Sequence, residues 1–124
     1  MSESVATQTL AEWMASYQKA WESNERQDIA ALFAERARYL REPYSAPIEG
    51  RDAIVANWLA HRDAPGNHTF MWQPLVETPE LTIVTGVTDY PGDTTYSNLW
   101  VIRFDGDGRA QEFTEWWMDQ SKPS

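Results

Sequence analysis

The sequence of 124 residues contains no cysteine, which excludes disulfide bonds, thiol nucleophiles and thiolate metal ligands. Positive charge is also scarce: 10 lysines and arginines stand against 19 aspartates and glutamates, giving a net charge of −9. Because nucleic acids and anionic membranes attract basic surfaces, neither is expected as a partner. Long apolar runs are missing as well, so we predict no transmembrane helix or signal peptide and expect a cytoplasmic protein.

Aromatic side chains are abundant instead. They make up 13% of the chain and include seven tryptophans. A chain of this length is predicted to form one domain, spanning residues 1–124, that buries a substantial core. Such a composition suits either a tryptophan-rich core or an aromatic ligand pocket, and composition alone does not decide between them.

Hydrophobic spacing predicts three helices in the first half of the chain. Apolar residues three and four positions apart predict a helix over residues 7–22. A second, short helix is expected over residues 26–34, with Asn24 and Gln27 as its N-terminal cap. The stretch GRDAIVANWLAHRD, residues 50–63, predicts the third helix.

The remaining chain reads as strands. A short strand is expected over residues 37–42, and the period then changes from helical to alternating, which predicts strands over residues 68–77, 80–90, 95–104 and 110–119. Helices first and antiparallel strands afterwards indicate an α+β fold with the helices packed on one face of a curved sheet.

The last strand raises the question of function. Alternation puts Phe113, Glu115 and Trp117 on one face and Glu112 and Trp116 on the other, but it does not say which face points inward. A glutamate in a tryptophan-lined cavity would be desolvated, which raises its pKa and makes it a better general base.

The two histidines do not indicate a metal site. His61 ends a predicted helix, His68 begins a predicted strand, and neither has a partner at the fixed spacing of a metal site. We therefore interpret both as structural or surface residues and expect no metal. No cofactor is expected either, because the acid–base chemistry considered below needs none.

The element order, together with EGRDAIVANW (49–58) and IRFDGDGRAQEFTEWW (102–117), resembles the nuclear transport factor 2-like superfamily. Within it, SnoaL-like and ketosteroid-isomerase-like domains are the most similar, and the resemblance covers essentially the whole chain. It implies a cone-shaped α+β barrel in which three N-terminal helices pack on a strongly curved antiparallel sheet and enclose a pocket. It does not imply one function, because this fold hosts isomerases, cyclases, dehydratases, epoxide hydrolases and non-catalytic binders.

The resemblance to ketosteroid isomerases suggests two catalytic positions. Tyr17, at its distance from Phe33, looks like the tyrosine that donates to the oxyanion in those enzymes. Glu42, immediately before Pro43, resembles their catalytic aspartate, although it is reached with one extra residue. The sequence departs from the pattern at Trp100, which stands where the isomerases carry a protonated aspartate.

A third position comes from the last strand. Polyketide cyclases and limonene epoxide hydrolases carry an acidic residue seven positions after the hairpin glycine, and counting from Gly108 this is Glu115. Trp117 resembles the pocket tryptophan of the isomerases, which turns its face of the strand inward. The resemblance therefore implies Tyr17, Glu42 and Glu115 as catalytic residues. The expected substrate-binding residues are Trp13, Trp58, Asn98, Trp100, Phe113 and Trp117.

Two functions remain open at this point. The first is a cofactor-free enzyme that moves a proton on a hydrophobic, carbonyl-containing substrate, as an isomerase, cyclase, hydratase or dehydratase does. The second is a non-catalytic module of the same fold, which binds a lipophilic ligand or forms a homodimer through the outer face of its sheet. A purely structural cavity is the third interpretation.

Overall fold

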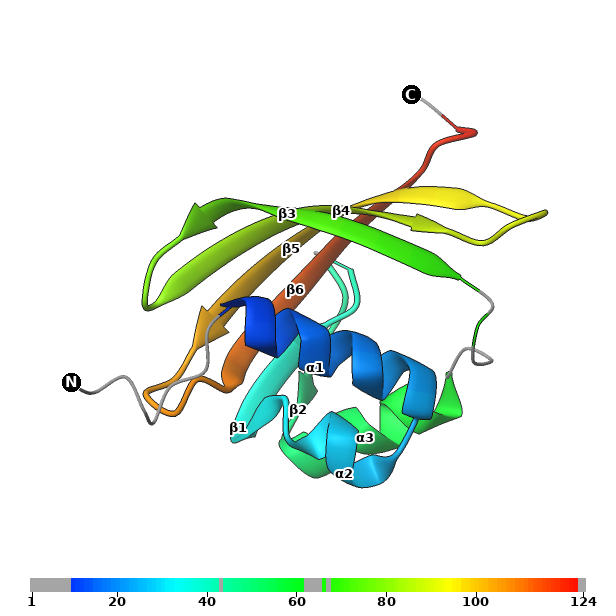
Figure 1. Cartoon of the computed structure of the whole chain (residues 1–124). Helices are drawn as coiled ribbons and strands as arrows, with labels where there is room; N and C mark the ends of the chain where they lie inside the picture. The colour runs from blue at the N-terminus through cyan, green and yellow to red at the C-terminus, as the bar shows by residue number, and fades with distance from the viewer. Residues whose placement is uncertain (1–9, 43, 62–65, 67, 123–124) are drawn as a thin grey trace.

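The computed structural model describes all residues except 1–9, 43, 62–65, 67 and 123–124 (Figure 1). Its helices are α1 (Leu10–Ser23), α2 (Arg26–Ala30) and α3 (Arg51–Ala60). Its strands are β1 (Phe33–Leu40), β2 (Ile48–Glu49), β3 (Thr69–Glu77), β4 (Leu81–Asp89), β5 (Thr95–Phe104) and β6 (Ala110–Asp119). Among these helices, none combines the length and apolar character that crossing a membrane requires.

All six strands form one curved sheet in the order β2-β1-β6-β5-β4-β3. The sheet is not closed, and β2 and β3 are its edges. Figure 1 shows α1 lying within the curve of the sheet, with α2 and α3 at the end near β1 and β2. The predicted α+β cone, with three helices packed on a strongly curved sheet, is confirmed.

One strand pair differs from the prediction of an antiparallel sheet. Strands β1 and β6 run parallel, with Tyr39 opposite Phe113 and Leu40 opposite Thr114. The other strand pairs in the described sheet are antiparallel. A parallel pair needs a long crossover connection, and here the crossover is α3 together with strands β3 to β5. Alternation within a strand reveals its faces but not its neighbour's direction.

The boundary between α2 and β1 also differs from the prediction. The helix expected over residues 26–34 ends at Ala30, and the strand expected from residue 37 begins at Phe33. Phe33 is fully buried and pairs with Ala110 of β6. Pairing with the sheet therefore outweighs the helical spacing of this segment. Residues 7–9 and 62–63 of the other predicted helices lie outside the described residues.

Asn24 ends α1 instead of capping α2. Its φ of 52° lies in the left-handed region, which asparagine tolerates better than most residues, and its N–H donates to the carbonyl of Ala20 at 2.8 Å. The N-cap of α2 is Glu25. The Asn24 side chain serves a different purpose, because its Oδ1 accepts a hydrogen bond from Trp58 Nε1 of α3 at 3.2 Å. This contact ties the end of α1 to α3.

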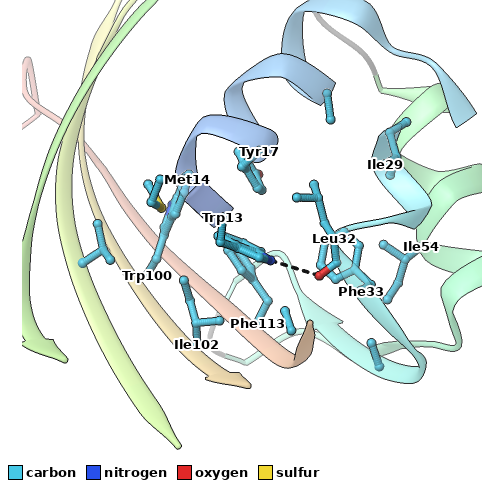
Figure 2. Close-up of a cluster of buried hydrophobic side chains, with 14 of the residues drawn as sticks. Trp13, Met14, Tyr17, Ile29, Leu32, Phe33, Ile54, Trp100, Ile102 and Phe113 are labelled. Carbon is cyan, nitrogen blue, oxygen red and sulfur yellow. Dashed lines mark hydrogen bonds between the residues drawn. The ribbon is translucent and has the colours of Figure 1, made fainter. Parts of the chain in front are cut away.

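The core is centred on the tryptophan of the first helix. Trp13 is fully buried, and its Nε1 donates to the carbonyl oxygen of Leu32 at 3.1 Å (Figure 2). The same oxygen accepts the backbone N–H of Ala110 at 2.9 Å. One carbonyl thus joins α1, the start of β1 and the start of β6.

A glycine in β4 lets two aromatic rings meet over the sheet. A Cβ at Gly86 would lie 2.7 Å from the ring of Phe70, well inside contact distance. The Phe70 ring in turn stacks on Trp100 with centroids 4.9 Å apart. Gly86 therefore leaves the space in which Phe70 holds the Trp100 indole against the concave face of the sheet.

We expect Trp13→Phe to lower the free energy of unfolding by about 1–3 kcal/mol, because it removes a buried hydrogen bond and leaves a small void. Urea denaturation of the purified variant measures this. Tyr44→Phe is the matched control, since Tyr44 is 96% exposed and its change should be well below 1 kcal/mol. Equal losses in the two variants would contradict the central role of Trp13.

Candidate active site

The space between α1, α3 and the concave face of the sheet holds a pocket of about 520 Å³. Half of the residues that line it are tyrosines or tryptophans, namely Tyr17, Trp21, Tyr39, Trp58, Tyr90, Tyr96, Trp100 and Trp117. Polar groups from the sheet also reach it, namely Thr88, Asn98 and Glu115. The volume is in the range of pockets that bind small molecules.

Glu115 on β6 is the carboxylate of this pocket. Asn98 Nδ2 donates to its Oε2 at 2.9 Å, and Trp100 Nε1 donates to the same oxygen at 3.2 Å. Both donors lie on β5, where Trp100 is directly opposite Glu115 in the register. Within the part of the chain that the structure describes, Oε1 has no hydrogen-bond partner. One carboxylate oxygen is therefore held in place while the other is available to a ligand.

A buried threonine fixes the direction of the Asn98 amide. Thr88 Oγ1 of β4 donates to Asn98 Oδ1 at 2.7 Å, so the amide NH₂ group must point toward Glu115. Thr88 and Asn98 are both buried. The hydrogen bonds form a chain from Thr88 through Asn98 to the carboxylate, and this chain orients a group that would otherwise be free to rotate.

Burial raises the pKa of the Glu115 carboxyl above its usual value, because the aromatic surroundings disfavour the charged form. The hydrogen bonds from Trp100 and Asn98 and the charge of Arg41 act in the opposite direction. Desolvation outweighs them. A carboxyl group with a raised pKa is better suited to exchanging protons near neutral pH than an exposed one.

Two tyrosines share a hydrogen bond beside this carboxylate. The hydroxyls of Tyr17 on α1 and Tyr39 on β1 are hydrogen-bonded to each other, and burial raises both pKa values well above the usual value. The negative charge of Glu115 raises both further, which means that the carboxylate lies near the pair. Two hydroxyls joined by one hydrogen bond keep one O–H that can donate to a ligand.

The structure brings together most of the residues expected at the site. Tyr17 and Glu115 both line the pocket, with a raised pKa at each group. The expected substrate-binding residues that also line it are Trp58, Asn98, Trp100 and Trp117. Trp117 and Trp116 point to opposite faces of the sheet, and Trp117 is the one on the pocket side.

Trp13 and Phe113 are not part of the pocket wall, which corrects the expectation that they bind substrate. Both are fully buried, and neither lines the cavity. The Trp13 indole lies 5.5 Å from the Tyr17 ring, and the Phe113 ring stacks on Tyr17 at 5.9 Å. These two residues support the pocket tyrosine from behind.

Glu42, which was predicted as a catalytic residue, is not among the residues that line the pocket with Tyr17 and Glu115. It is exposed in the turn after β1, where its carbonyl accepts a hydrogen bond from Ser45 Oγ at 2.9 Å. Residues on a strand alternate between faces, so the one extra residue in the comparison with isomerases moves the carboxylate to the wrong side. The residue that lines the pocket here is Arg41.

Sequence reasoning did not single out Tyr39 and Arg41, although both line the pocket. A signal was present in the segment itself, because Tyr39 and Arg41 are two residues apart and therefore share a face of an extended chain. What the sequence alone could not provide was the parallel pairing with β6, which puts Tyr39 opposite Phe113 on the concave side.

Proton transfer is the chemistry for which this geometry is suited. A carboxylate with one open oxygen and a hydroxyl pair lie in the same aromatic cavity, so one group can take a proton while the other stabilises charge that develops on a neighbouring oxygen. Among the described residues, no group of three or more histidine, cysteine, aspartate or glutamate side chains is placed to hold a metal ion.

Comparison with known proteins identifies the family. The SnoaL-like domain family matches residues 14–115, which include both Tyr17 and Glu115. None of the curated proteins matches this chain.

Solved structures show the same fold at low sequence identity. An NTF-2 like protein of unknown function from Burkholderia xenovorans has a TM-score of 0.72 at 16% identity, with 92% of this chain and 86% of that chain covered. A protein from Sphaerobacter thermophilus has a TM-score of 0.69 at 21% identity, covering 88% and 95%. A steroid delta-isomerase from Pseudomonas aeruginosa has a TM-score of 0.64 at 15% identity, covering 90% and 80%.

We predict that Asn98→Ala raises the pKa of Glu115 further, because it removes a donor that favours the charged carboxylate. Carbon-detected NMR titration of the glutamate carboxyl groups measures this, and Glu115→Gln assigns the signal by removing it. Asn57→Ala is the matched control, since Asn57 lines the pocket without a hydrogen bond to Glu115. A Glu115 signal that titrates near ~4.3 in the wild type would contradict the buried environment.

Proposed function

The chain belongs to the SnoaL-like domain family, and on this premise we propose that it is a cofactor-free enzyme that transfers a proton on a hydrophobic, carbonyl-containing small molecule. The observation that carries the proposal is Glu115, a half-buried carboxyl group with one fixed and one open oxygen in an aromatic pocket. The reaction would be of the isomerase, cyclase, hydratase or dehydratase type.

The proposed step begins with Glu115 as the base. Its open Oε1 takes a proton from the carbon next to the substrate carbonyl, and the electron pair of that C–H bond moves toward the carbonyl to form an enolate. The negative charge develops on the carbonyl oxygen. The free O–H of the Tyr17–Tyr39 pair donates to this oxygen, and the hydrogen bond between the two hydroxyls strengthens that donation.

Return of the proton from Glu115 completes the step. In an isomerisation the enolate is conjugated with a second double bond, and Glu115 returns the proton to the far carbon of that system while the carbonyl re-forms. In a cyclisation the enolate carbon bonds to a second carbonyl carbon, the π electrons of that carbonyl move to its oxygen, and this oxygen takes the proton from Glu115. The aromatic walls support this chemistry because rings such as Trp58 and Trp117 give an apolar surface against which a hydrophobic substrate can lie.

The steroid isomerase among the similar structures shares the fold of this chain, but this likeness does not identify a substrate. Where the resembling isomerases carry a protonated aspartate, this chain has Trp100, whose single N–H already donates to Glu115. This pocket therefore offers the one free O–H of the Tyr17–Tyr39 pair where those isomerases have two oxyanion donors. We propose a different carbonyl substrate for this reason.

A deuterium-exchange assay tests the proposal. We expect the wild type to accelerate exchange of the α-protons of β-tetralone in D₂O, followed by proton NMR. Glu115→Gln should slow the enzymatic exchange by about 100-fold or more, because it removes the base. Glu112→Gln is the matched control on the same strand, since Glu112 faces away from the pocket and pairs with Arg38 and Arg103.

The alternative function is a non-catalytic pocket that binds a lipophilic ligand. It predicts that β-tetralone changes the tryptophan fluorescence equally in the wild type and in Glu115→Gln, with no exchange above background in either protein. Binding without exchange would therefore replace the enzyme by the binder, whereas exchange that survives in Glu115→Gln would exclude this residue as the base.

We also propose that the outer face of the sheet forms a homodimer. A row of residues paired in register crosses this face through Met71 on β3, Val87 on β4, Ser97 on β5 and Met118 on β6, and its three apolar members are 41–75% exposed. Trp116, also on this face, is 44% exposed. Glu112 on this face is held between Arg38 at 3.1 Å and Arg103 at 3.3 Å, so the charge of this glutamate is paired and does not by itself repel a second copy.

Sedimentation velocity tests the dimer. We expect a dimer for the wild type at micromolar concentration and a monomer for Trp116→Lys, because a charge at the centre of an apolar contact is costly to bury. Tyr44→Lys is the matched control, since Tyr44 is 96% exposed in the loop after β1 and should leave the dimer intact. A wild-type monomer would overturn the proposal.

A further inference from the structure

Arg41 is a cationic group in the pocket that the proton transfer does not use. It directly follows β1, where Tyr39 is opposite Phe113 and Leu40 is opposite Thr114 in the parallel pair with β6. Continuing this register places Arg41 beside Glu115, on the same face as Tyr39. Arg41 lines the pocket and is exposed, so it lies where the cavity meets solvent.

The charge of Arg41 is not consumed by an ion pair. Arg38 pairs with Glu49 and Glu112, and Arg103 pairs with Glu112, on the outer face of the sheet, whereas Arg41 faces the pocket. Among the described residues, none forms a salt bridge or hydrogen bond with Arg41. In a protein with a net charge of −9, an unpaired arginine at the mouth of a pocket is notable because acidic groups are plentiful.

A role as the counter-ion of Glu115 does not account for it. The groups that hold the Glu115 carboxylate are Asn98 and Trp100, and both donate to Oε2. Arg41 acts on Glu115 only through space, as the weakest of the influences on its pKa, and burial still raises that pKa. The guanidinium is therefore near the reacting carboxyl group but not bound to it.

We propose that Arg41 binds a carboxylate of the ligand, so that the molecule taken by this pocket is a hydrophobic acid. The inference rests on the proposed function and names its substrate class. A guanidinium presents paired N–H donors in a planar fork that matches a carboxylate. The eight tyrosines and tryptophans of the wall suit the apolar part of such a ligand, and the single arginine supplies the positive charge that pairs with its carboxylate.

The pocket favours a singly charged group. Asp93 also lines the cavity, and its carboxylate repels a dianion more strongly than a monoanion. The described lining contains one arginine and no lysine, whereas a phosphate dianion calls for more positive charge than one guanidinium. Asn57 and His61 of α3 line the same cavity and offer further hydrogen-bonding groups.

This anchor also sets the orientation of the ligand. With its carboxylate on the exposed Arg41, the ligand directs its apolar body inward, toward Trp58 and Trp100. A carbonyl further along that body then reaches the Tyr17–Tyr39 pair, and the carbon beside it lies next to Glu115. The carboxylate and the reacting carbonyl are thus two separate groups of the same molecule.

A matched pair of probes tests the inference. The dissociation constants of naphthylacetate and its neutral amide are measured by tryptophan fluorescence and calorimetry at constant ionic strength, on the wild type, Arg41→Gln, Arg41→Lys and Arg36→Gln. We expect the acid to bind the wild type about tenfold more tightly than the amide, as a charge-assisted hydrogen bond provides. Arg36→Gln, an exposed arginine of β1 outside the pocket, should keep this ratio.

The ratio of the two affinities decides the outcome. In Arg41→Gln it should fall to about one, and in Arg41→Lys it should be intermediate, because the charge remains while the planar fork is lost. A ratio near one in the wild type, an unchanged ratio in Arg41→Gln, or an equal loss of both probes in that variant would each overturn the inference.

Failure of this inference is distinguishable from failure of the proposed function. Equal binding of acid and amide by the wild type would exclude anion recognition by Arg41 and leave the ligand pocket in place. Lack of binding by both probes, together with lack of exchange of β-tetralone, would overturn the anion site and the proton-transfer pocket together.

Discussion

The carbonyl of Leu32 is the point at which three distant parts of this chain meet. It accepts hydrogen bonds from the Trp13 indole of α1 and from the backbone of Ala110 at the start of β6. Breaking either hydrogen bond would leave a buried donor without a partner, which is costly. The junction sets the position of Tyr17, one helical turn after Trp13, and the starting register of the strand that carries Glu115. The geometry of the site therefore follows from a backbone contact in the core.

The site itself is a compromise between burial and hydrogen bonding. Aromatic walls raise the pKa of Glu115, yet a carboxyl group without partners would be too costly to keep there. Asn98 and Trp100 satisfy one oxygen and leave the other to the cavity. Thr88 holds the amide in the orientation that this requires. Each polar group is thus fixed by a neighbouring strand, which suits a pocket that must be ready before its ligand arrives.

The sequence predicted what depends on local periodicity and missed what depends on distant pairing. The helical stripe placed Tyr17 inward, and the alternating pattern of the last strand paired Glu115 with Trp117 on one face. Glu42 was misplaced because a shift of a single residue reverses the face of a strand. Phe33 was assigned to a helix because its pairing with β6 involves residues far along the chain. Neither error could be corrected from the local pattern.

The parallel pairing of β1 and β6 has a consequence for how this molecule is assembled. Strand β1 lies early in the chain, but its neighbour in the centre of the sheet is separated from it by more than 70 residues. Contacts between such distant segments form slowly, because the chain loses the entropy of closing a long loop before the new contacts stabilise it. During synthesis the tyrosine pair and the wall residues Trp21 and Trp58 exist in the chain well before Glu115 can join them. The pocket is complete only when β6 lies between β1 and β5. The site therefore forms in the same step as the last strand pairing of the sheet.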